Sequence, residues 1–204
     1  MSSATAGETL LAAQSLSLER GGRQLFDGLS FAVCAGQLIQ VDGANGAGKT
    51  SLLRILAGLS RYGFEGNITR QSSLLYLGHQ AGVKQLLTPR ENLAWHAAGE
   101  GEYANADIEQ ALAHVGLTGY EDVSSHTLSA GQHRRVNLAR LYLSSSPLWL
   151  LDEPFAAIDQ KGVAELERLM VKHVSAGGAV IITSHQSLQV SYPLSRLSLS
   201  AGLQ

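Results

Sequence analysis

The part of the sequence best suited to chemistry is a glycine-rich run that ends in a lysine and a threonine, Gly43-Ala44-Asn45-Gly46-Ala47-Gly48-Lys49-Thr50. This run matches the phosphate-loop pattern G-x-x-x-x-G-K-[ST] at every fixed position. Glycines allow the backbone to curl closely around a polyphosphate, with its N–H groups pointing inward. Lys49 can reach the β- and γ-phosphates, and the hydroxyl of Thr50 can bind Mg²⁺. The run therefore predicts a nucleotide-binding site.

The residues on both sides of this run favour a ligand-binding loop over an ordinary glycine-rich turn. Residues 37–41 are largely apolar and predict a strand that enters the loop. Residues 50–57 predict a helix that leaves it, and Gly58 is the expected end of that helix. The N-terminus of such a helix carries a partial positive charge where the phosphates would bind. We therefore expect all eight residues of the run, and Ser51 after it, to contact the nucleotide.

The composition of the chain is that of a folded protein with one domain. The chain has 204 residues, of which 45% are hydrophobic and 16% are charged. Its formal net charge of −2 offers no broad basic surface, which argues against nucleic acid as the main partner. Cys34 is the only cysteine, so no internal disulfide is expected, and we predict a small buried strand residue there.

The hydrophobic pattern predicts neither a signal peptide nor a membrane span. The N-terminus lacks a basic segment followed by an apolar core, and no stretch of about 20 apolar residues occurs. We therefore expect a protein of the cytosol or one that docks on a cytosolic face.

Around the glycine-rich run, the first part of the chain predicts short strands, several of them antiparallel. The predicted strands are Leu10–Leu18, Arg23–Phe26 after a turn at Gly21-Gly22, Leu29–Val33, Gly66–Arg70 and Ser73–Leu77. Strand character returns late in the chain, in Pro147–Leu151, Ala179–Thr183 and Arg196–Leu199. Between the first two of these late strands, an apolar stripe at helical spacing predicts a helix packed on the core.

The middle of the chain predicts a helical insertion between strands of one sheet. Thr88 and Glu91 form a predicted capping box around Pro89, which would start the first helix. Two more helices are predicted over Asn105–Val115 and from Ser129 to Leu143. We interpret Trp95 and His96 in the first helix as packing and surface residues rather than ligands.

Chemistry-bearing residues collect just beyond the C-terminal ends of apolar strands, at Gly43, Gln80, Asp152 with Glu153, and His185. Ligands of open α/β sheets bind at that edge. Asp152 at an exposed strand end suits a role on Mg²⁺, and Glu153 can polarise a water for attack on the γ-phosphate. His185 could donate a hydrogen bond to that phosphate. The alternatives are an ordinary surface acidic pair and a structural histidine.

The segment Leu128–Gln132 combines two properties of a helix start. The pattern from Ser129 to Gln132 is a helix capping box. A helix N-terminus that is approached through small residues such as Gly131 is also an anion site. Both interpretations can hold together.

In order along the chain, these motifs resemble those of the nucleotide-binding domains of ATP-binding-cassette (ABC) transporters, and the match covers essentially the whole chain. The resemblance implies a single α/β domain over residues 1–204. Its core would be a P-loop NTPase with a mostly parallel sheet and an N-terminal antiparallel β-subdomain (1–81 and 145–204). Residues 82–144 would form an inserted α-helical subdomain that carries the signature motif of the family, which corresponds to Leu128–Gln132.

The resemblance also implies a mechanism that uses ATP and Mg²⁺. Two copies would sandwich two ATP molecules, each held by the phosphate loop of one copy and the signature of the other. ATP would close this homodimer and hydrolysis would reopen it. Gln80, Glu153 and His185 would be catalytic. Thr50, Gln80 and Asp152 would hold the metal, and further nucleotide contacts would come from Ser129, Gly131, Gln132 and Asp159.

The sequence departs from the family pattern at two positions. Ala130 stands where the signature usually has glycine, so its backbone would be strained if it needed a positive φ. Arg20 stands where many relatives have an aromatic residue that stacks on adenine. An arginine can also stack on a base through its guanidinium plane. Phe26 is the second candidate for that contact.

Several stretches also resemble the ATPase subunits of bacterial cytochrome c maturation systems: residues 76–80, 138–141, 153–159 and 183–186. That resemblance implies an integral membrane subunit of the same transporter, a haem-handling membrane protein and a haem chaperone as partners. It places the chain at the cytoplasmic face of the bacterial inner membrane. ATP hydrolysis would serve export of haem or release of the haem-loaded chaperone.

Other functions remain open on the sequence alone. The chain could be the ATPase subunit of another small-substrate transporter, or a soluble ABC ATPase of translation or DNA repair. Tandem cassettes and basic surfaces, typical of the latter, are absent from this sequence. A P-loop kinase or GTPase would leave the signature and His185 unexplained.

Overall fold

The computed structural model describes residues 7–97 and 103–199. The chain divides into two compact units. The first comprises residues 1–76, 146–153 and 166–204, and the second comprises residues 77–145 and 154–165. Within the described ranges, no helix is long and apolar enough to cross a bilayer.

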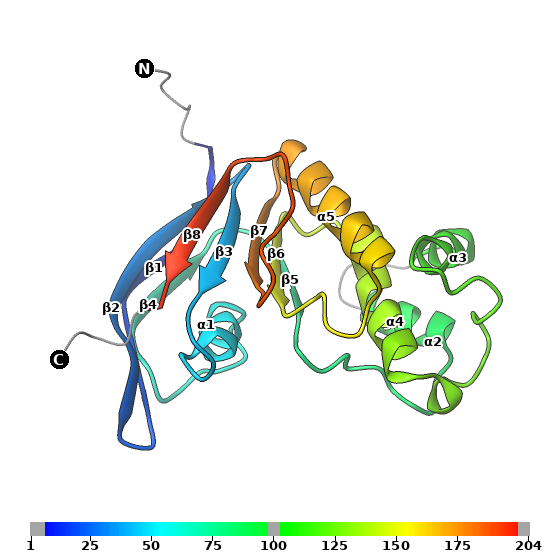
Figure 1. Cartoon of the computed structure of the whole chain (residues 1–204), viewed down its shortest axis with the longest axis horizontal. Helices are drawn as coiled ribbons and strands as arrows, with labels where there is room; N and C mark the ends of the chain where they lie inside the picture. Colours follow the sequence, from blue (N-terminus) through cyan, green and yellow to red (C-terminus); the bar gives the residue numbers. More distant parts are fainter. Residues whose placement is uncertain (1–6, 98–102, 200–204) are drawn as a thin grey trace. The chain divides into compact units, whose positions relative to one another are not determined.

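An antiparallel sheet with the strand order β2-β1-β4 belongs to the first unit (Figure 1). Its strands are β1 (Thr9–Arg20), β2 (Arg23–Cys34) and β4 (Glu65–Arg70). The predicted turn at Gly21-Gly22 joins β1 to β2, and both glycines have positive φ values of 59° and 74°. Such values suit a two-residue hairpin loop.

The two strands predicted over Arg23–Phe26 and Leu29–Val33 are one continuous strand, which corrects the sequence interpretation. A bulge at Gly28, where φ is 60°, absorbs the break in alternation. The hydroxyl of Ser17 on β1 donates to Asp27 and accepts the N–H of Gly28, so the neighbouring strand bridges the bulge. Cys34 at the end of β2 is half-buried rather than fully buried as predicted, because it lies at the end of its strand beside Thr9.

A second sheet has the strand order β5-β6-β7-β3-β8. Its strands are β3 (Leu38–Asp42), β5 (Leu74–Leu77), β6 (Leu148–Asp152), β7 (Ala179–Thr183) and β8 (Leu194–Ser198). The pairs β6–β7, β3–β7 and β3–β8 are parallel, so the carboxyl ends of these strands share one edge. Every residue of β6 and β7 is buried, as their continuous apolar sequences predict.

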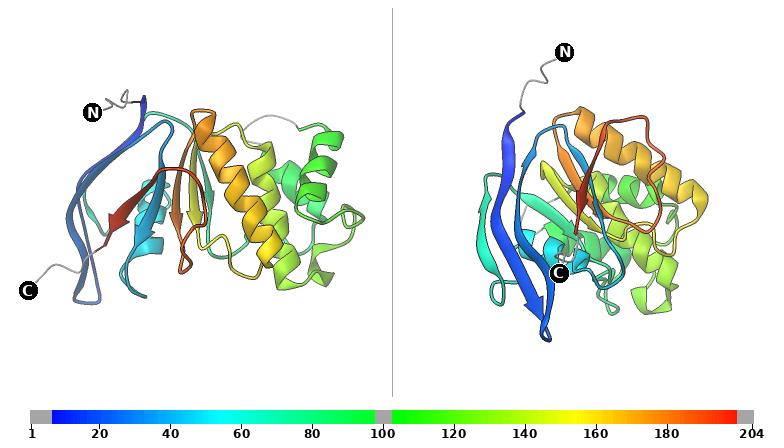
Figure 2. Two further views of the ribbon diagram at one scale, coloured as in Figure 1. Left: turned by 45° about the horizontal axis from the view of Figure 1, so that its top comes forward. Right: turned by 60° about the vertical axis from the view of Figure 1, so that its left-hand side comes forward.

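The core of the first unit is formed mainly by leucine, isoleucine and valine side chains from β1, β3, β6, β7 and helix α1 (Lys49–Leu56). Figure 2 shows α1 directly after β3, and Leu52, Leu53, Ile55 and Leu56 of this helix are buried. The helix ends as predicted, since Ala57 is its C-cap and Gly58 follows with a φ of 75°. The apolar face of α1 thus anchors the helix in the core of the first unit.

The second unit holds the predicted helical insertion (Figure 1). Its helices are α2 (Pro89–Ala97), α3 (Asn105–His114) and α4 (Ala130–Leu143), with a short 3₁₀ turn at Ser125–Thr127. They share a core of buried apolar residues that includes Leu93, Leu112 and Val136. Helix α5 (Gln160–Ser175), the last one within the described residues, begins in this unit and ends in the first.

The capping box predicted around Pro89 is present. The N–H of Glu91 donates to the Thr88 hydroxyl at 3.2 Å, and the N–H of Thr88 donates to the Glu91 carboxylate at 2.8 Å. In α2, Trp95 is exposed and the Lys84 ammonium lies 4.5 Å from the centre of its ring. His96 is partly buried, and burial, followed by the charges of Arg140 and Lys84, lowers its pKa to about 4.

Candidate functional site

The glycine-rich run forms the connection between β3 and α1. Gly48 is the N-cap of α1 and provides no side-chain hydrogen bond to the first turn. A helix start of this kind suits an anion better than one capped by a side chain. The loop itself is held by a turn in which the N–H of Ala47 donates to the carbonyl of Ala44 at 3.1 Å.

Two glycines of the run are required by the backbone. Gly46 and Gly48 have φ values of 79° and 99°, which side chains rarely adopt. At Gly48 space is also tight, since a Cβ there would lie 3.2 Å from the Cβ of Leu25 on β2. At Gly46 nothing lies within 4 Å, so the loop is open on that side. An open, glycine-lined curve is what a polyphosphate needs for close approach to the backbone.

The lysine of the run folds back over the loop. Its Nζ donates to the carbonyl of Gly43 at 2.7 Å and to that of Ala44 at 3.3 Å. These contacts hold the ammonium over the entrance of the loop. Thr50 and Ser51 follow in the first turn of α1.

Asp152 is fully buried, which corrects the expectation of an exposed strand end. It is the last residue of β6 and lies opposite Thr183 on β7 in the parallel register. Two hydroxyls donate to its Oδ1, that of Thr50 at 3.1 Å and that of Thr183 at 2.8 Å. Burial of a carboxylate is tolerated where such donors compensate for the lost water.

Glu153 and His185 lie in contact with each other. Glu153 Oε1 is 3.4 Å from His185 Nε2, and the N–H of His185 donates to Glu153 Oε2 at 3.3 Å. The Glu153 side chain is 19% exposed, whereas that of His185 is 60% exposed. The carboxylate is thus shielded on one side while the imidazole faces solvent.

The backbone of Glu153 is unusual. Its φ of 49° lies in the left-handed region, which non-glycine residues seldom occupy. Its N–H donates both to the carbonyl and to the hydroxyl of Thr183, at 3.2 and 2.9 Å. The sharp turn after β6 is therefore held by the end of β7.

The first unit thus places together the phosphate loop, Thr50, Asp152, Glu153 and His185, as predicted from the strand ends. Thr183, which links both acidic residues, is not among the residues predicted from the sequence. The signal that could have revealed it is a hydroxyl residue at the end of the apolar run Ala179–Ile182.

The remaining candidates, Gln80, the signature residues and Asp159, lie in the second unit. Gln80 is exposed in the loop after β5. The carbonyls of Gly78 and His79, just before it, accept hydrogen bonds from the buried guanidinium of Arg134 at 2.8 and 3.2 Å. Helix α4 therefore fixes the start of the Gln80 loop through a residue that sequence analysis did not single out.

The signature segment forms the predicted capping box. The Ser129 hydroxyl accepts the N–H of Gln132 at 3.2 Å, and the Gln132 side chain accepts the N–H of Ser129 at 2.8 Å. Gly131 is closely packed, because a Cβ there would lie 3.0 Å from the carbonyl oxygen of Ala157. Ala130 is the first residue of α4 and, among the described residues, is not one of those with a positive φ, so the strain considered for it does not arise.

Asp159 lies just before α5. Its Oδ1 accepts the N–H of Gly162 at 2.9 Å, as an N-cap residue does, and its Oδ2 pairs with Arg135 of α4 at 3.4 Å. The carboxylate remains 63% exposed. It thus ties the start of α5 to the signature helix and still faces solvent.

The two candidates for an adenine contact differ in exposure. Phe26 is only 2% exposed and packs in the core, so its ring offers no free face. Arg20 is exposed at the end of β1, next to the Gly21-Gly22 turn. Arg20 is the better candidate of the two.

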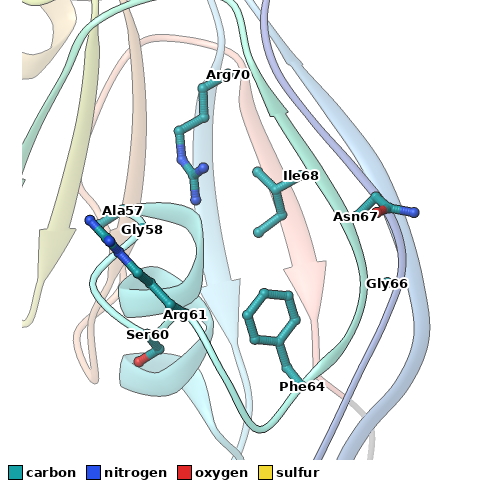
Figure 3. Close-up of a pocket in the computed structure, with 9 residues that line it drawn as sticks. All are labelled: Ala57, Gly58, Ser60, Arg61, Phe64, Gly66, Asn67, Ile68 and Arg70. Carbon is teal, nitrogen blue, oxygen red and sulfur yellow. The ribbon is translucent and has the colours of Figure 1, made fainter.

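An open pocket of about 500 Å³ lies beside the C-terminal end of α1, away from the phosphate loop (Figure 3). Arg70 on β4 points to this helix end and donates to the carbonyls of Ile55 and Leu56 at 2.8 and 2.7 Å. Burial lowers the pKa of Arg70. The guanidinium therefore caps the last turn of α1, and we assign this pocket no part in the phosphate chemistry.

Comparison with known proteins identifies the family. Residues 26–156 match the family described as ABC transporter. The chain belongs to this family. The chain is also similar to the cytochrome c biogenesis ATP-binding export proteins CcmA of Shewanella frigidimarina and Hahella chejuensis. The chain is 51% identical to each, over 90% of its length and 89% of the first protein, and over 96% of its length and 98% of the second.

The fold of this ABC-type ATPase also matches that of solved ATP-binding cassettes. One is the dimeric cassette MJ0796, described in a post-hydrolysis state with bound ADP and phosphate. The TM-score is 0.77 at 20% sequence identity, over 86% of this chain and 88% of the other. At that identity the likeness establishes the fold, including the P-loop core with its antiparallel sheet and helical insertion.

Proposed function

We propose that this chain is the ATP-hydrolysing subunit of a membrane exporter that serves cytochrome c biogenesis. The observation that carries the proposal is the 51% identity to proteins named for that process, over at least nine tenths of this chain. The geometry of the site supports the enzymatic part of the proposal. We further propose that residues 1–81 and 145–204 act as the ATP-binding core and residues 82–144 as the helical part that carries the signature.

The phosphate loop and Lys49 are proposed to hold the nucleotide. The backbone of Gly43–Gly48 would surround the phosphates, and Thr50 and Ser51 would add contacts from the first turn of α1. Lys49 would exchange the carbonyls of Gly43 and Ala44 for phosphate oxygens, a short movement for a flexible side chain. Arg20 is the proposed contact for adenine.

The chemistry of Thr50 and Asp152 fits Mg²⁺. Their oxygens are 3.1 Å apart, and hydroxyl and carboxylate oxygens are ligands that this hard cation prefers. Within the described residues there is no cluster of three or more His, Cys, Asp or Glu side chains that could hold a metal ion. This suits an ion that takes few protein ligands, with Gln80 as a further one, and its other ligands from phosphates and water. Bound Mg²⁺ would neutralise charge on the phosphate oxygens.

Glu153 is the proposed general base for hydrolysis. Its carboxylate would accept a proton from a water whose oxygen bonds to the γ-phosphorus, while the bond from that phosphorus to the β–γ bridging oxygen breaks. The products are ADP and inorganic phosphate. His185, 3.4 Å from the Glu153 carboxylate, would donate a hydrogen bond to the γ-phosphate, and Gln80 would help to place the water.

Two copies of the chain are proposed to complete the site. Ser129, Gly131 and Gln132 at the exposed start of α4 would contact the γ-phosphate of ATP held by the other copy. Asp159, which remains largely exposed, would add a contact across the same dimer. That the solved cassette MJ0796, of the same fold, is dimeric supports the proposal that two copies act together.

The proposed partners are an integral membrane subunit, a haem-handling membrane protein and a haem chaperone. The chain would dock at the cytoplasmic face of the bacterial inner membrane. Hydrolysis would serve export of haem or release of the haem-loaded chaperone.

Capture from native membranes tests this proposal. The Glu153→Gln variant keeps the shape of the side chain but removes the base, so it should retain ATP and stay in the closed dimer. We would purify it with ATP and Mg²⁺, identify the proteins that come with it and record the haem absorption spectrum. The matched control carries Lys49→Ala in addition and should not form the closed dimer.

The outcomes separate the alternatives. A multi-span subunit with haem-bearing partners would support the whole proposal. A multi-span subunit without haem would leave a transporter ATPase of another substrate. Nucleic acid or ribosomes without a membrane partner would overturn the proposal in favour of a soluble ABC ATPase.

A further inference from the structure

The hydroxyl of Thr183 lies between the two acidic residues of the site. It donates to Asp152 Oδ1 at 2.8 Å and accepts the N–H of Glu153 at 2.9 Å. The main-chain carbonyl of Thr183 accepts the same N–H at 3.2 Å. One fully buried residue therefore touches the proposed metal ligand and the proposed general base together.

The packing around Thr183 does not account for its hydroxyl, because the rest of its strand is apolar. Residues 179–182 of β7 are apolar and buried, and a valine has the same shape as a threonine. Burying a hydroxyl is unfavourable unless it makes hydrogen bonds. Both bonds of this hydroxyl go to the acidic pair. The polar atom is thus explained by that pair and not by packing.

The first bond fixes the carboxylate of Asp152. The Thr183 hydroxyl and the Thr50 hydroxyl reach the same oxygen, Oδ1, from two sides. Hydrogen bonds donated to a carboxylate favour its ionised form and restrict its rotation. With Oδ1 held in this way, the carboxylate keeps one orientation toward the phosphate loop before any nucleotide binds.

The second hydrogen bond, from the N–H of Glu153 to the Thr183 hydroxyl, fixes the direction in which the Glu153 side chain points. The left-handed backbone of Glu153, with its φ of 49°, persists only where neighbours enforce it. The N–H of Glu153 is held by two acceptors, both from Thr183. Because φ at this residue decides where its side chain points, Thr183 also controls the position of the carboxylate that lies 3.4 Å from His185.

We propose that Thr183 is a positioning residue for ATP hydrolysis, which sets the metal-binding aspartate and the catalytic glutamate relative to each other. It acts through these two residues and touches no substrate. The inference rests on ATP hydrolysis at this site and is independent of the transported molecule.

A pair of substitutions tests the role of the hydroxyl. Thr183→Val removes it at constant shape, and Thr183→Ser keeps it with less volume. ATP hydrolysis would be measured in the transporter complex at varied ATP and varied Mg²⁺, together with ATP binding and thermal unfolding. A hydrogen bond to a charged group corresponds to a change of about 10- to 100-fold in a rate or an equilibrium constant.

We expect Thr183→Val to lower kcat by about 10- to 100-fold and to raise the Mg²⁺ concentration needed for half of the maximal rate. KM for ATP should change far less, because the phosphate loop is untouched. Thr183→Ser should recover most of the wild-type rate although it leaves a small cavity. If Thr183→Val does not fold, Thr183→Cys replaces it, since a thiol is a weak donor of similar size.

A purely structural role would give a different result. The inference is overturned if Thr183→Val keeps the wild-type kcat, or if Thr183→Ser is as slow as Thr183→Val. It is also overturned if rates follow the loss of thermal stability with no change in Mg²⁺ dependence. Glu153→Gln serves as the reference variant. If it still hydrolyses ATP, the assignment of Glu153 as the general base is wrong, whereas the role of Thr183 is judged from its own variants.

Discussion

Ser129 has a structural task that is visible in the chain and a proposed task toward ATP, and substitutions can separate the two. As the N-cap of α4, its hydroxyl accepts the N–H of Gln132 at 3.2 Å. In the proposed dimer the same hydroxyl contacts the γ-phosphate bound by the other copy. Ser129→Ala removes both functions. Ser129→Asp keeps the cap, since aspartate caps helices as well as serine does, but adds a negative charge next to the phosphate.

The size of each effect follows from these contacts. Loss of the cap in Ser129→Ala should cost about 1 kcal/mol of stability, which for a chain of this size lowers Tm by about 2–4 °C. The other hydrogen bond of the capping box, which the N–H of residue 129 donates to the side chain of Gln132, can still form. Ser129→Asp should melt near the wild type, because a carboxylate at a helix N-terminus is favourable. In the proposed dimer, this carboxylate would lie about 4 Å from the γ-phosphate. The repulsion between the two negative charges would oppose dimerisation by about 4 kcal/mol at an effective dielectric constant near 20.

The assay combines thermal unfolding without nucleotide and sedimentation with ATP and Mg²⁺. Both would use the Glu153→Gln background, so that ATP is not consumed. We expect Ser129→Asp to unfold like the parent protein and yet to form no ATP-dependent dimer. Ser129→Asn, a neutral cap of similar size, is the matched control and should dimerise better than Ser129→Asp. If Ser129→Asp forms the dimer as readily as the parent protein, Ser129 is only a helix cap and the proposed ATP sandwich lacks this contact.

Two further perturbations test other parts of the site and the fold. Lys49→Ala should abolish hydrolysis and weaken ATP binding by at least about 10-fold, because the only ammonium of the phosphate loop is lost; retained turnover would contradict the role of the loop. For His96, the pKa of about 4 in the folded chain is below the ordinary value of 6.5. Between these two pH values the unfolded chain therefore binds more protons than the folded chain. The free energy of unfolding should fall as the pH drops from about 6.5 to 4. Allowing for its partial exposure, the loss is about 1 to 2 kcal/mol, and urea unfolding of His96→Gln should show a correspondingly smaller decline with pH.

The local features of the site could be predicted from the sequence because each depends on a few neighbouring residues. The phosphate loop, the end of α1 at Gly58 and both capping boxes follow from such short patterns, and the hydrogen bonds of Ser129 with Gln132 are those that the pattern requires. The arrangement of chemical residues at the strand ends also follows from local runs, since parallel strands bring their carboxyl ends to one edge.

The features that could not be predicted depend on residues far apart in the chain. Asp152 is buried because the register of β6 and β7 places it opposite Thr183, 31 residues later, and because Thr50 reaches it from α1. β2 stays continuous across the bulge at Gly28, where Ser17 of the paired strand bonds to both Asp27 and Gly28. The local sequence around an acidic residue at the end of a strand, or around a break in alternation, does not show which residue of the neighbouring strand will pair with it.

Burial divides the residues of the proposed ATP site into a fixed part and a movable part. Asp152 and Thr183 are fully buried and hydrogen-bonded to each other, so their geometry is set before nucleotide binds. Lys49 and His185 are held by contacts that ATP can replace, to loop carbonyls in one case and to Glu153 in the other. In the proposed mechanism, ATP would therefore have to reorganise only the exposed side of the site. Since the buried side would need no movement, the energy of binding would be left to draw Lys49 and His185 onto the phosphates and to bring the proposed second copy into place.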